Sequence, residues 1–136
     1  MKTKYEIALK RSFNQVKRWR KAFYLYEDKV GAKDRFIKLI REELTESFEA
    51  TNRSKSLDLY VDVVFFCLSS AIEEGLKFSE IYVEYSRADD AIDRSKCSWK
   101  SLGKELETTA YLLTAKGNWS LGSIIEQMLI VTKIIY

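Results

Sequence analysis

The most apolar stretch of the chain is Leu57-Asp58-Leu59-Tyr60-Val61-Asp62-Val63-Val64-Phe65-Phe66-Cys67-Leu68-Ser69-Ser70-Ala71-Ile72-Glu73-Glu74. Drawn as a helix, it places apolar side chains on nearly every face, and Gly75 follows at a position where glycine commonly ends a helix. We therefore predict a central helix over residues 57–74 that is buried on several sides, either inside one chain or at an oligomer interface.

Helical periodicity continues on both sides of this stretch. Apolar residues recur at steps of three and four, and the chain has no proline and only five glycines to interrupt its helices. The pattern predicts helices over residues 5–26, 33–50, 80–96, 99–116 and 120–135, with Phe78-Ser79 as the staple and N-cap of the helix that follows. The last helix is too apolar to stand in water unpacked, so it either closes the bundle or pairs with another subunit.

Length and composition limit the fold class. With 136 residues, 46% of them hydrophobic and 32% charged, the chain fits one folded domain over residues 1–136. We predict an all-α antiparallel bundle of about four core helices plus C-terminal helices. We also expect a homodimer, tetramer or other oligomer, because the central helix is apolar on too many sides for a lone chain.

Several classes of function are excluded by what the sequence lacks. Histidine is absent, which removes His-based zinc sites and Ser-His-Asp triads. No glycine-rich phosphate loop is present, and Cys67 and Cys97 do not form a redox or metal-binding pair, so Cys67 is expected to be a buried small residue. No stretch approaches the roughly 20 apolar residues of a membrane span, and we expect a cytoplasmic protein without a membrane partner.

The first predicted helix carries most of the positive charge. Residues 1–21 contain eight basic side chains and one acidic one, although the whole chain has a net charge of +3. The basic residues on the face of this helix, which could attract nucleic acid or a triphosphate, are Lys10, Arg11, Lys17, Arg18, Arg20 and Lys21. A solvated helix face is the favoured interpretation, and a nucleic-acid partner ranks lowest because no groove-reading motif accompanies the charge.

Two groups of carboxylates face each other across one predicted loop. Glu42, Glu43 and Glu46 fall within an arc of roughly 100° on one helix, and Asp58 and Asp62 lie one turn apart on the next. Such a set of oxygen donors suits Mg²⁺ or Mn²⁺. The alternative is a surface helix turn with Asp58 at a helix N-terminus, but Asp62 lies a full turn inside an apolar segment and favours the metal site.

These residues resemble a known family. The family is the all-α nucleoside triphosphate pyrophosphohydrolases, in particular the MazG-type and phosphoribosyl-ATP pyrophosphohydrolase-like branch. The resemblance covers about residues 13–96 and leaves 98–136 as a C-terminal helical extension. The stretches that carry it are Val16–Phe23, Phe36–Glu46, Asp58–Phe66, Ala71–Leu76 and Glu80–Glu84.

The resemblance implies a Mg²⁺-dependent enzyme that hydrolyses a nucleoside triphosphate to the monophosphate and pyrophosphate. It assigns the metal ligands to Glu42, Glu43, Glu46, Asp58 and Asp62, with Glu42 or Glu46 as the catalytic base that orients the attacking water. Four aromatic residues could stack on a substrate base, but core packing is the favoured interpretation for each: Trp19, Phe23, Tyr82 and Tyr85.

The sequence departs from the family pattern in two places. Leu59 occupies a position where many members have glutamate, and Asp58 takes its role as in the phosphoribosyl-ATP-like branch. Acidic residues follow Arg87 where members carry phosphate-binding side chains, which leaves Arg87, Arg94 or Lys96 for substrate binding. The alternative function is a helical-bundle interaction protein of the same fold that has lost turnover.

Overall fold

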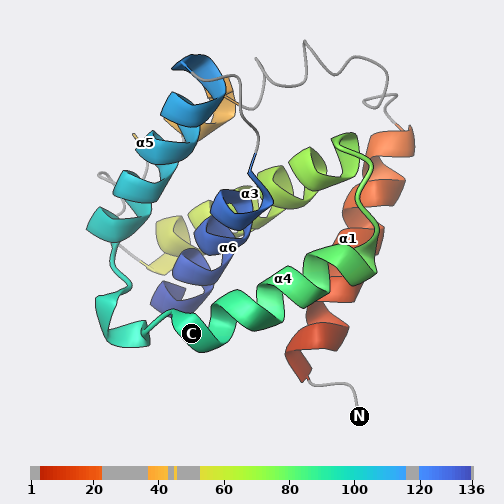
Figure 1. Ribbon diagram of the computed structural model, residues 1–136, viewed down its shortest axis with the longest axis horizontal. Coiled ribbons are helices and arrows are strands. Elements are labelled where there is room, and N and C mark those ends of the chain that lie inside the picture. Colours follow the sequence, from red (N-terminus) through yellow and green to blue (C-terminus); the bar gives the residue numbers. More distant parts are fainter. Residues whose placement is uncertain (1–3, 23–36, 43–44, 46–52, 116–119, 136) are drawn as a thin grey trace.

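The computed structural model describes residues 4–22, 37–42, 45, 53–115 and 120–135 (Figure 1). The regular elements of this part are α1 (Lys4–Ala22), α3 (Arg53–Glu73), α4 (Phe78–Ala91), the 3-10 helix η1 (Arg94–Lys96), α5 (Trp99–Ala115) and α6 (Leu121–Ile135). Residues 37–42 are helical as well, and no strand occurs in the described ranges. The all-α prediction is confirmed, whereas the rest of the predicted helices over 5–26 and 33–50 lies outside the described residues.

The connection between α3 and α4 follows from one glycine. Gly75 has a φ of 80°, which only glycine adopts without strain. The amide of Leu76 donates to the carbonyl of Ala71 at 3.1 Å and the amide of Gly75 to that of Ile72 at 2.9 Å, the paired bonds that end a helix and turn the chain. The predicted stop at Gly75 is therefore confirmed, and α4 then runs in the opposite general direction to α3 (Figure 1).

The prediction of Ser79 as the N-cap of the next helix is wrong. The N-cap of α4 is Lys77, so Phe78 and Ser79 already lie inside the helix. The carboxylate of Glu80 accepts a hydrogen bond from the amide of Lys77 at 3.2 Å, which satisfies one of the donors at this helix end from three residues away. Phe78 packs against Phe13 of α1, with ring centroids 5.8 Å apart.

The predicted helix over 80–96 is divided in two by the structure. Ile92 has an extended backbone, and the side chain of Asp93 accepts a hydrogen bond from the amide of Ser95 at 3.0 Å. A short acidic side chain that bonds to the backbone two residues ahead competes with helical hydrogen bonding. The α-helix therefore ends at Ala91, and residues 94–96 form the 3-10 turn η1.

The last two helices begin at serines. The hydroxyl of Ser98 accepts from the amide of Ser101 at 3.1 Å, and the hydroxyl of Ser101 accepts from the amide of Ser98 at 2.8 Å. Ser120 accepts from the amide of Ser123 at 3.3 Å in the same way. These caps explain why α5 and α6 start within a residue of the predicted boundaries.

The helix at the centre of the bundle is α6 rather than α3. It packs against α3, α4 and α5, and Figure 1 shows these three helices around it. The side chains that α6 buries are Ile124, Ile125, Gln127, Met128, Leu129 and Val131. The α3 helix is open to solvent near its start, where Asp58 and Val61 are exposed, but none of its residues from Asp62 to Glu73 is exposed. Of the two roles predicted for the last helix, it takes the one that closes the bundle.

The first helix packs against α3 and α4 through a single apolar edge made by Leu9, Phe13 and Val16. Its contacts advance along α1 and α3 together: Trp19 meets Phe65, and Arg20 one residue later meets Glu73. The two helices therefore run in the same general direction. None of the described helices is long and apolar enough to cross a membrane.

Candidate functional site

The predicted acidic pair lies on one face of α3. Asp58 is exposed, and Asp62 one turn later is half-buried. Burial raises the pKa of the Asp62 carboxyl above its ordinary value of 3.8, and the charge of Asp58 raises it further. Both causes oppose the ionised form of Asp62, so a cation bound at this pair would relieve them both.

Further along α3, Glu73 is held by a cation from α1. The guanidinium Nη1 of Arg20 lies 2.6 Å from the carboxylate of Glu73 and also donates to the hydroxyl of Ser69. Arg20 is only 2% exposed, so the prediction that it belongs to a solvated basic face is wrong. The spacing carried a signal for this burial, because Arg20 continues the helical series of Leu9, Phe13 and Val16.

The glutamate-rich turn is only partly described. Glu42 is exposed at the end of the helical residues 37–42, and Ile40 on the opposite side of this turn is 2% exposed. Glu43 and Glu46 lie outside the described residues. Within the described ranges, no three acidic or cysteine side chains come together as a ligand group for a metal ion, so Glu42, Asp58 and Asp62 do not form a closed site by themselves.

Of the three cations predicted for substrate binding, Arg87 is already paired. It is exposed and forms an ion pair with Glu84 one turn earlier in α4, and this contact lowers the pKa of the Glu84 carboxyl. Lys96 is exposed on η1, and Arg94 lines a cavity of about 370 Å³ beside Asp89, Asp93 and Lys133. The three cations are spread over α4 and η1, and nothing in these contacts draws them toward Asp62.

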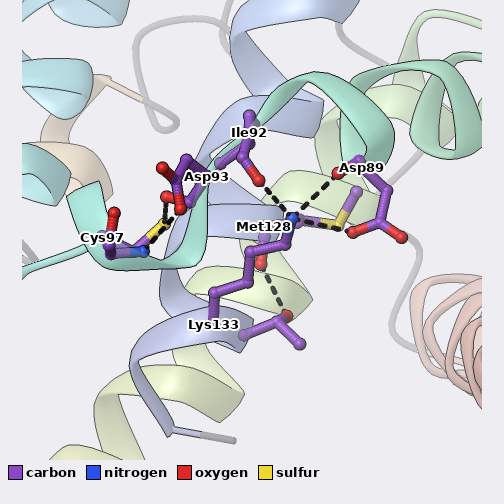
Figure 2. Close-up of polar contacts among 8 residues, drawn as sticks. Asp89, Ile92, Asp93, Cys97, Met128 and Lys133 are labelled. Atoms are coloured by element: carbon purple, nitrogen blue, oxygen red, sulfur yellow. Dashed lines mark hydrogen bonds and ion pairs between the residues drawn. The ribbon is translucent and has the colours of Figure 1, made fainter.

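The cavity beside Arg94 has a structural cation, shown in Figure 2. The ammonium of Lys133 donates to the carbonyls of Ile92 at 2.7 Å and Asp89 at 2.9 Å, and it lies 3.0 Å from the Asp89 carboxylate. A lysine at this position satisfies carbonyls at the end of α4 and complements the helix dipole. Lys133 therefore fastens α6 to the end of α4, and its three donors are already used.

A second hollow lies between α1 and α3, next to the acidic pair. It measures about 350 Å³ and is lined by Ser12, Gln15, Val16, Trp19, Tyr60, Val61, Val64 and Phe65. Trp19 is 41% exposed and meets Phe65 edge-on, with ring centroids 5.0 Å apart. Tyr82, by contrast, stacks on Phe78 in α4, as expected for core packing. Phe23 lies outside the described residues.

Sequence reasoning missed a carboxyl pair between α5 and α6. Glu105 of α5 lies near Glu126 of α6, and burial followed by the charge of Glu126 raises the pKa of Glu105 from 4.5 to about 7. Both causes oppose the ionised form of Glu105. No local sequence pattern predicts this contact, because the two glutamates come from different helices.

A buried polar chain accompanies this pair. The amide of Gln127 donates to the hydroxyl of Thr109 at 2.5 Å, and its carbonyl oxygen lies 3.8 Å from the sulfur of Cys67. Thr109 in turn donates to the backbone carbonyl of Glu105 at 3.0 Å. Cys67 is buried as predicted, and its thiol is the end of a polar chain that joins α3, α6 and α5.

Comparisons of the chain with protein-family models, curated proteins and solved structures found no match.

Proposed function

We propose that the protein is a Mg²⁺-dependent nucleoside triphosphate pyrophosphohydrolase that cleaves its substrate to the monophosphate and pyrophosphate. The observation that carries the proposal is the Asp58–Asp62 pair on α3. Asp62 is a half-buried carboxylate whose pKa is raised both by burial and by a like charge one turn away. Carboxyl groups with such surroundings concentrate at functional sites and at sites of cations.

The residues fit a hard divalent ion. Asp58, Asp62 and Glu42 offer carboxylate oxygens, which are the donors that Mg²⁺ and Mn²⁺ prefer. Glu43 and Glu46 complete the ligand set that the sequence resemblance implies. When bound, the ion supplies positive charge that neutralises the triphosphate and polarises its phosphorus.

The remaining roles belong to side chains of the chain itself. Asp58 and Asp62 present their carboxylates on one face of α3. The Arg20–Glu73 ion pair anchors the other end of this helix. Glu42 or Glu46 accepts the proton of the attacking water. Arg94 and Lys96 on η1 are the cations proposed to contact phosphates, and Arg87 can join them only by leaving Glu84.

The direct test is turnover of a panel of triphosphates. The purified chain is incubated with MgCl₂ and with standard and modified ribo- and deoxyribonucleoside triphosphates, and monophosphate and pyrophosphate are measured. We expect equal amounts of both products from at least one member of the panel. Release of orthophosphate instead would contradict cleavage between the α and β phosphates.

Variants connect any turnover to the assigned residues. Asp62→Ala and Glu43→Ala are each expected to abolish turnover, while Asp90→Asn, which changes an exposed aspartate on α4, serves as the matched control. Turnover that survives both alanine variants would show that the site lies elsewhere. Absence of turnover with the whole panel, together with no rise of Tm on adding Mg²⁺, would favour the non-enzymatic interaction protein.

The oligomeric state is part of the same proposal. Most apolar residues of α3 and α6 are covered inside a single chain, so the argument from an over-apolar central helix is weaker than the sequence suggested. The exposed apolar residues on the α1–α3 side, Trp19 and Val61, remain the surface that a second copy would cover. Sedimentation of the full chain at several concentrations measures whether a homodimer or tetramer forms.

A further inference from the structure

The outward face of α1 carries a dense stripe of positive charge. At 100° per residue, its exposed cations fall within an arc of about 120°, opposite the buried residues of the same helix. The members of this basic stripe are Lys10, Arg11, Lys17, Arg18 and Lys21. Since α1 packs against α3 and α4 through its other side, the stripe faces solvent along most of the helix.

The stripe has almost no compensation within the described part of the chain. Lys10 lies 5.9 Å from the ring centroid of Phe78, a cation–π contact that leaves its charge intact. The other four members form no ion pair with a described residue, whereas Arg20, the cation that does, points to the opposite side of the helix and is buried. The one acidic residue of α1, Glu6, lies four residues before Lys10 and is its neighbour on the helix, so it offsets charge only at the start of the stripe.

The cations of the basic stripe repel one another, and a bound anion would remove this repulsion. Lys17 and Lys21 are like charges four residues apart, and Arg18 and Lys21 are three apart, spacings at which helix side chains are neighbours. A solvated surface helix ordinarily interleaves both signs of charge, which avoids this repulsion. The stripe is therefore better suited to face a line of negative charges than to face water.

Three kinds of anionic partner differ in what they need. A free triphosphate is too short, because Lys10 and Lys21 are separated by about 16 Å along the helix at 1.5 Å per residue. A helix that inserts into a lipid surface needs an apolar face, and Leu9, Phe13 and Val16 of α1 are committed to the core. A folded protein partner needs an apolar interface centre, and the described side chains of α1 expose only two large apolar residues, Ile7 and Trp19.

We propose that the basic stripe of α1 binds the phosphate backbone of nucleic acid without reading its sequence. A regular array of phosphates supplies the charge at the required spacing and requires neither an apolar patch nor a groove-reading motif. This surface is separate from the acidic pair on α3, so the inference stands whether or not the protein turns over triphosphates.

Binding of a fluorescently labelled 20-base-pair DNA duplex to the full chain tests the inference, measured by anisotropy at a series of salt concentrations. Four to five phosphate contacts predict a slope of about −4 for the logarithm of the binding constant against that of salt concentration. Two duplexes of unrelated sequence are expected to bind equally. A slope near zero, or a strong preference for one sequence, would overturn the proposal.

A charge-matched pair of variants assigns the binding to α1. Lys17→Gln/Arg18→Gln is expected to weaken binding and reduce the slope by about two, one for each lost contact. Lys100→Gln/Lys104→Gln removes the same charge from exposed positions on α5 and is expected to bind like the unaltered chain. Equal weakening by both variants would mean that net charge alone attracts DNA, and the assignment to α1 would fail.

Two further measurements keep the result interpretable. All four altered positions are exposed, so the Tm of both variants is expected to match that of the unaltered chain, which separates lost binding from lost folding. Vesicles with 30% anionic lipid replace the DNA in a second arm. Binding to vesicles in the absence of binding to DNA would overturn the proposal in favour of a lipid surface. Since the acidic pair lies on α3, away from the basic stripe, Asp62→Asn is expected to leave DNA binding unchanged.

Discussion

Two regions of the molecule place carboxyl pairs in partly buried surroundings and relieve them differently. On α3, Asp58 and Asp62 belong to one helix and lie one turn apart, and burial and like charge both oppose the ionised form of Asp62. Between α5 and α6, Glu105 and Glu126 come from different helices, and burial and the charge of Glu126 raise the pKa of Glu105 to about 7. The first pair is open to a cation, whereas in the second pair protonation of Glu105 relieves the repulsion below about pH 7.

The difference follows from geometry. Neighbouring carboxylates on one helix point the same way and leave room for a third group between them and solvent. A carboxyl that meets another between two packed helices is partly removed from water, so burial and like charge together favour its protonated form. Glu73 is a third case, in which a permanent cation from another helix neutralises the carboxylate, since Arg20 lies 2.6 Å from it.

The largest expected effect concerns this third case. Arg20→Met leaves Glu73 without its cation at a place where the arginine side chain is 3% and the glutamate 15% exposed, and breaking such a pair costs about 3–5 kcal/mol. The free energy of unfolding in urea measures it. Arg18→Gln, at an exposed neighbour, should change it by less than about 0.5 kcal/mol. If Arg20→Met/Glu73→Leu does not recover most of the loss, the charge of Glu73 that Arg20 normally offsets is not its cause.

The next effect concerns the polar chain beside the glutamate pair. Gln127→Ala removes the partner of the Thr109 hydroxyl and leaves a cavity at a side chain that is 1% exposed, so we expect a loss of about 2–3 kcal/mol in unfolding free energy. Gln15→Ala on α1 is the exposed control. A loss no larger than that of the control would show that the Gln127–Thr109 bond does not stabilise the contact between α5 and α6.

Glu105 predicts a dependence of stability on pH. Its pKa in the folded chain, about 7, is above its ordinary value of 4.5, so the folded state binds more protons between these values. The stabilising contribution is therefore complete below about pH 4.5 and is lost as the pH rises to about 7. After a discount for solvent screening of this half-buried group, we expect a loss of about 1 kcal/mol.

The matching variant is Glu105→Gln, which keeps the hydrogen-bonding shape without the charge. The difference in Tm between pH 5 and pH 8 is expected to be smaller in this variant than in the unaltered chain, and the variant is expected to be the more stable of the two at pH 8. Glu107→Gln, on the exposed side of α5, is the control. An unchanged pH profile in Glu105→Gln would show that the Glu105 carboxyl does not cause the pH dependence.

The smallest effect on stability is expected at the acidic pair of α3. Asp62→Asn removes a charge that its surroundings oppose, so without metal the variant should be as stable as the unaltered chain, within about 0.5 kcal/mol, or slightly more stable at neutral pH. The readout that matters is the response to Mg²⁺. At about ten times the dissociation constant, binding would stabilise the unaltered chain by about 1.4 kcal/mol, and the variant should lose this rise. A rise that persists in Asp62→Asn would place the ion elsewhere.

Much of the fold could be predicted because helix formation depends on local sequence patterns. The spacing of apolar residues located α1, α3, α5 and α6, and Gly75 marked the turn after α3. Local chemistry also explains the two errors at the ends of α4. The Glu80 carboxylate satisfies the Lys77 amide, and the Asp93 side chain bonds to the amide of Ser95. These short-range bonds compete with the apolar periodicity, which alone does not place a helix end.

Some features of the candidate site could likewise be predicted from the sequence, and others could not. The one-turn spacing of Asp58 and Asp62 on a shared face was readable from the sequence, and so was the contrast between Asp62 and its apolar neighbours. The partners of other charged groups were not readable. Arg20 was predicted to face water although its spacing placed it in the apolar series, and Arg87 was predicted to reach phosphates although it binds Glu84.

The sequence by itself therefore determined where most of the described helices lie, the turn at Gly75 and the face on which the Asp58–Asp62 pair lies. The tertiary structure decided that α6 is the central helix and that Glu73 meets Arg20, Glu105 meets Glu126 and Gln127 meets Thr109. The reason is the range of the interactions. Helical periodicity and capping act within about four residues, whereas contacts between helices depend on which faces pack together once the whole chain has folded.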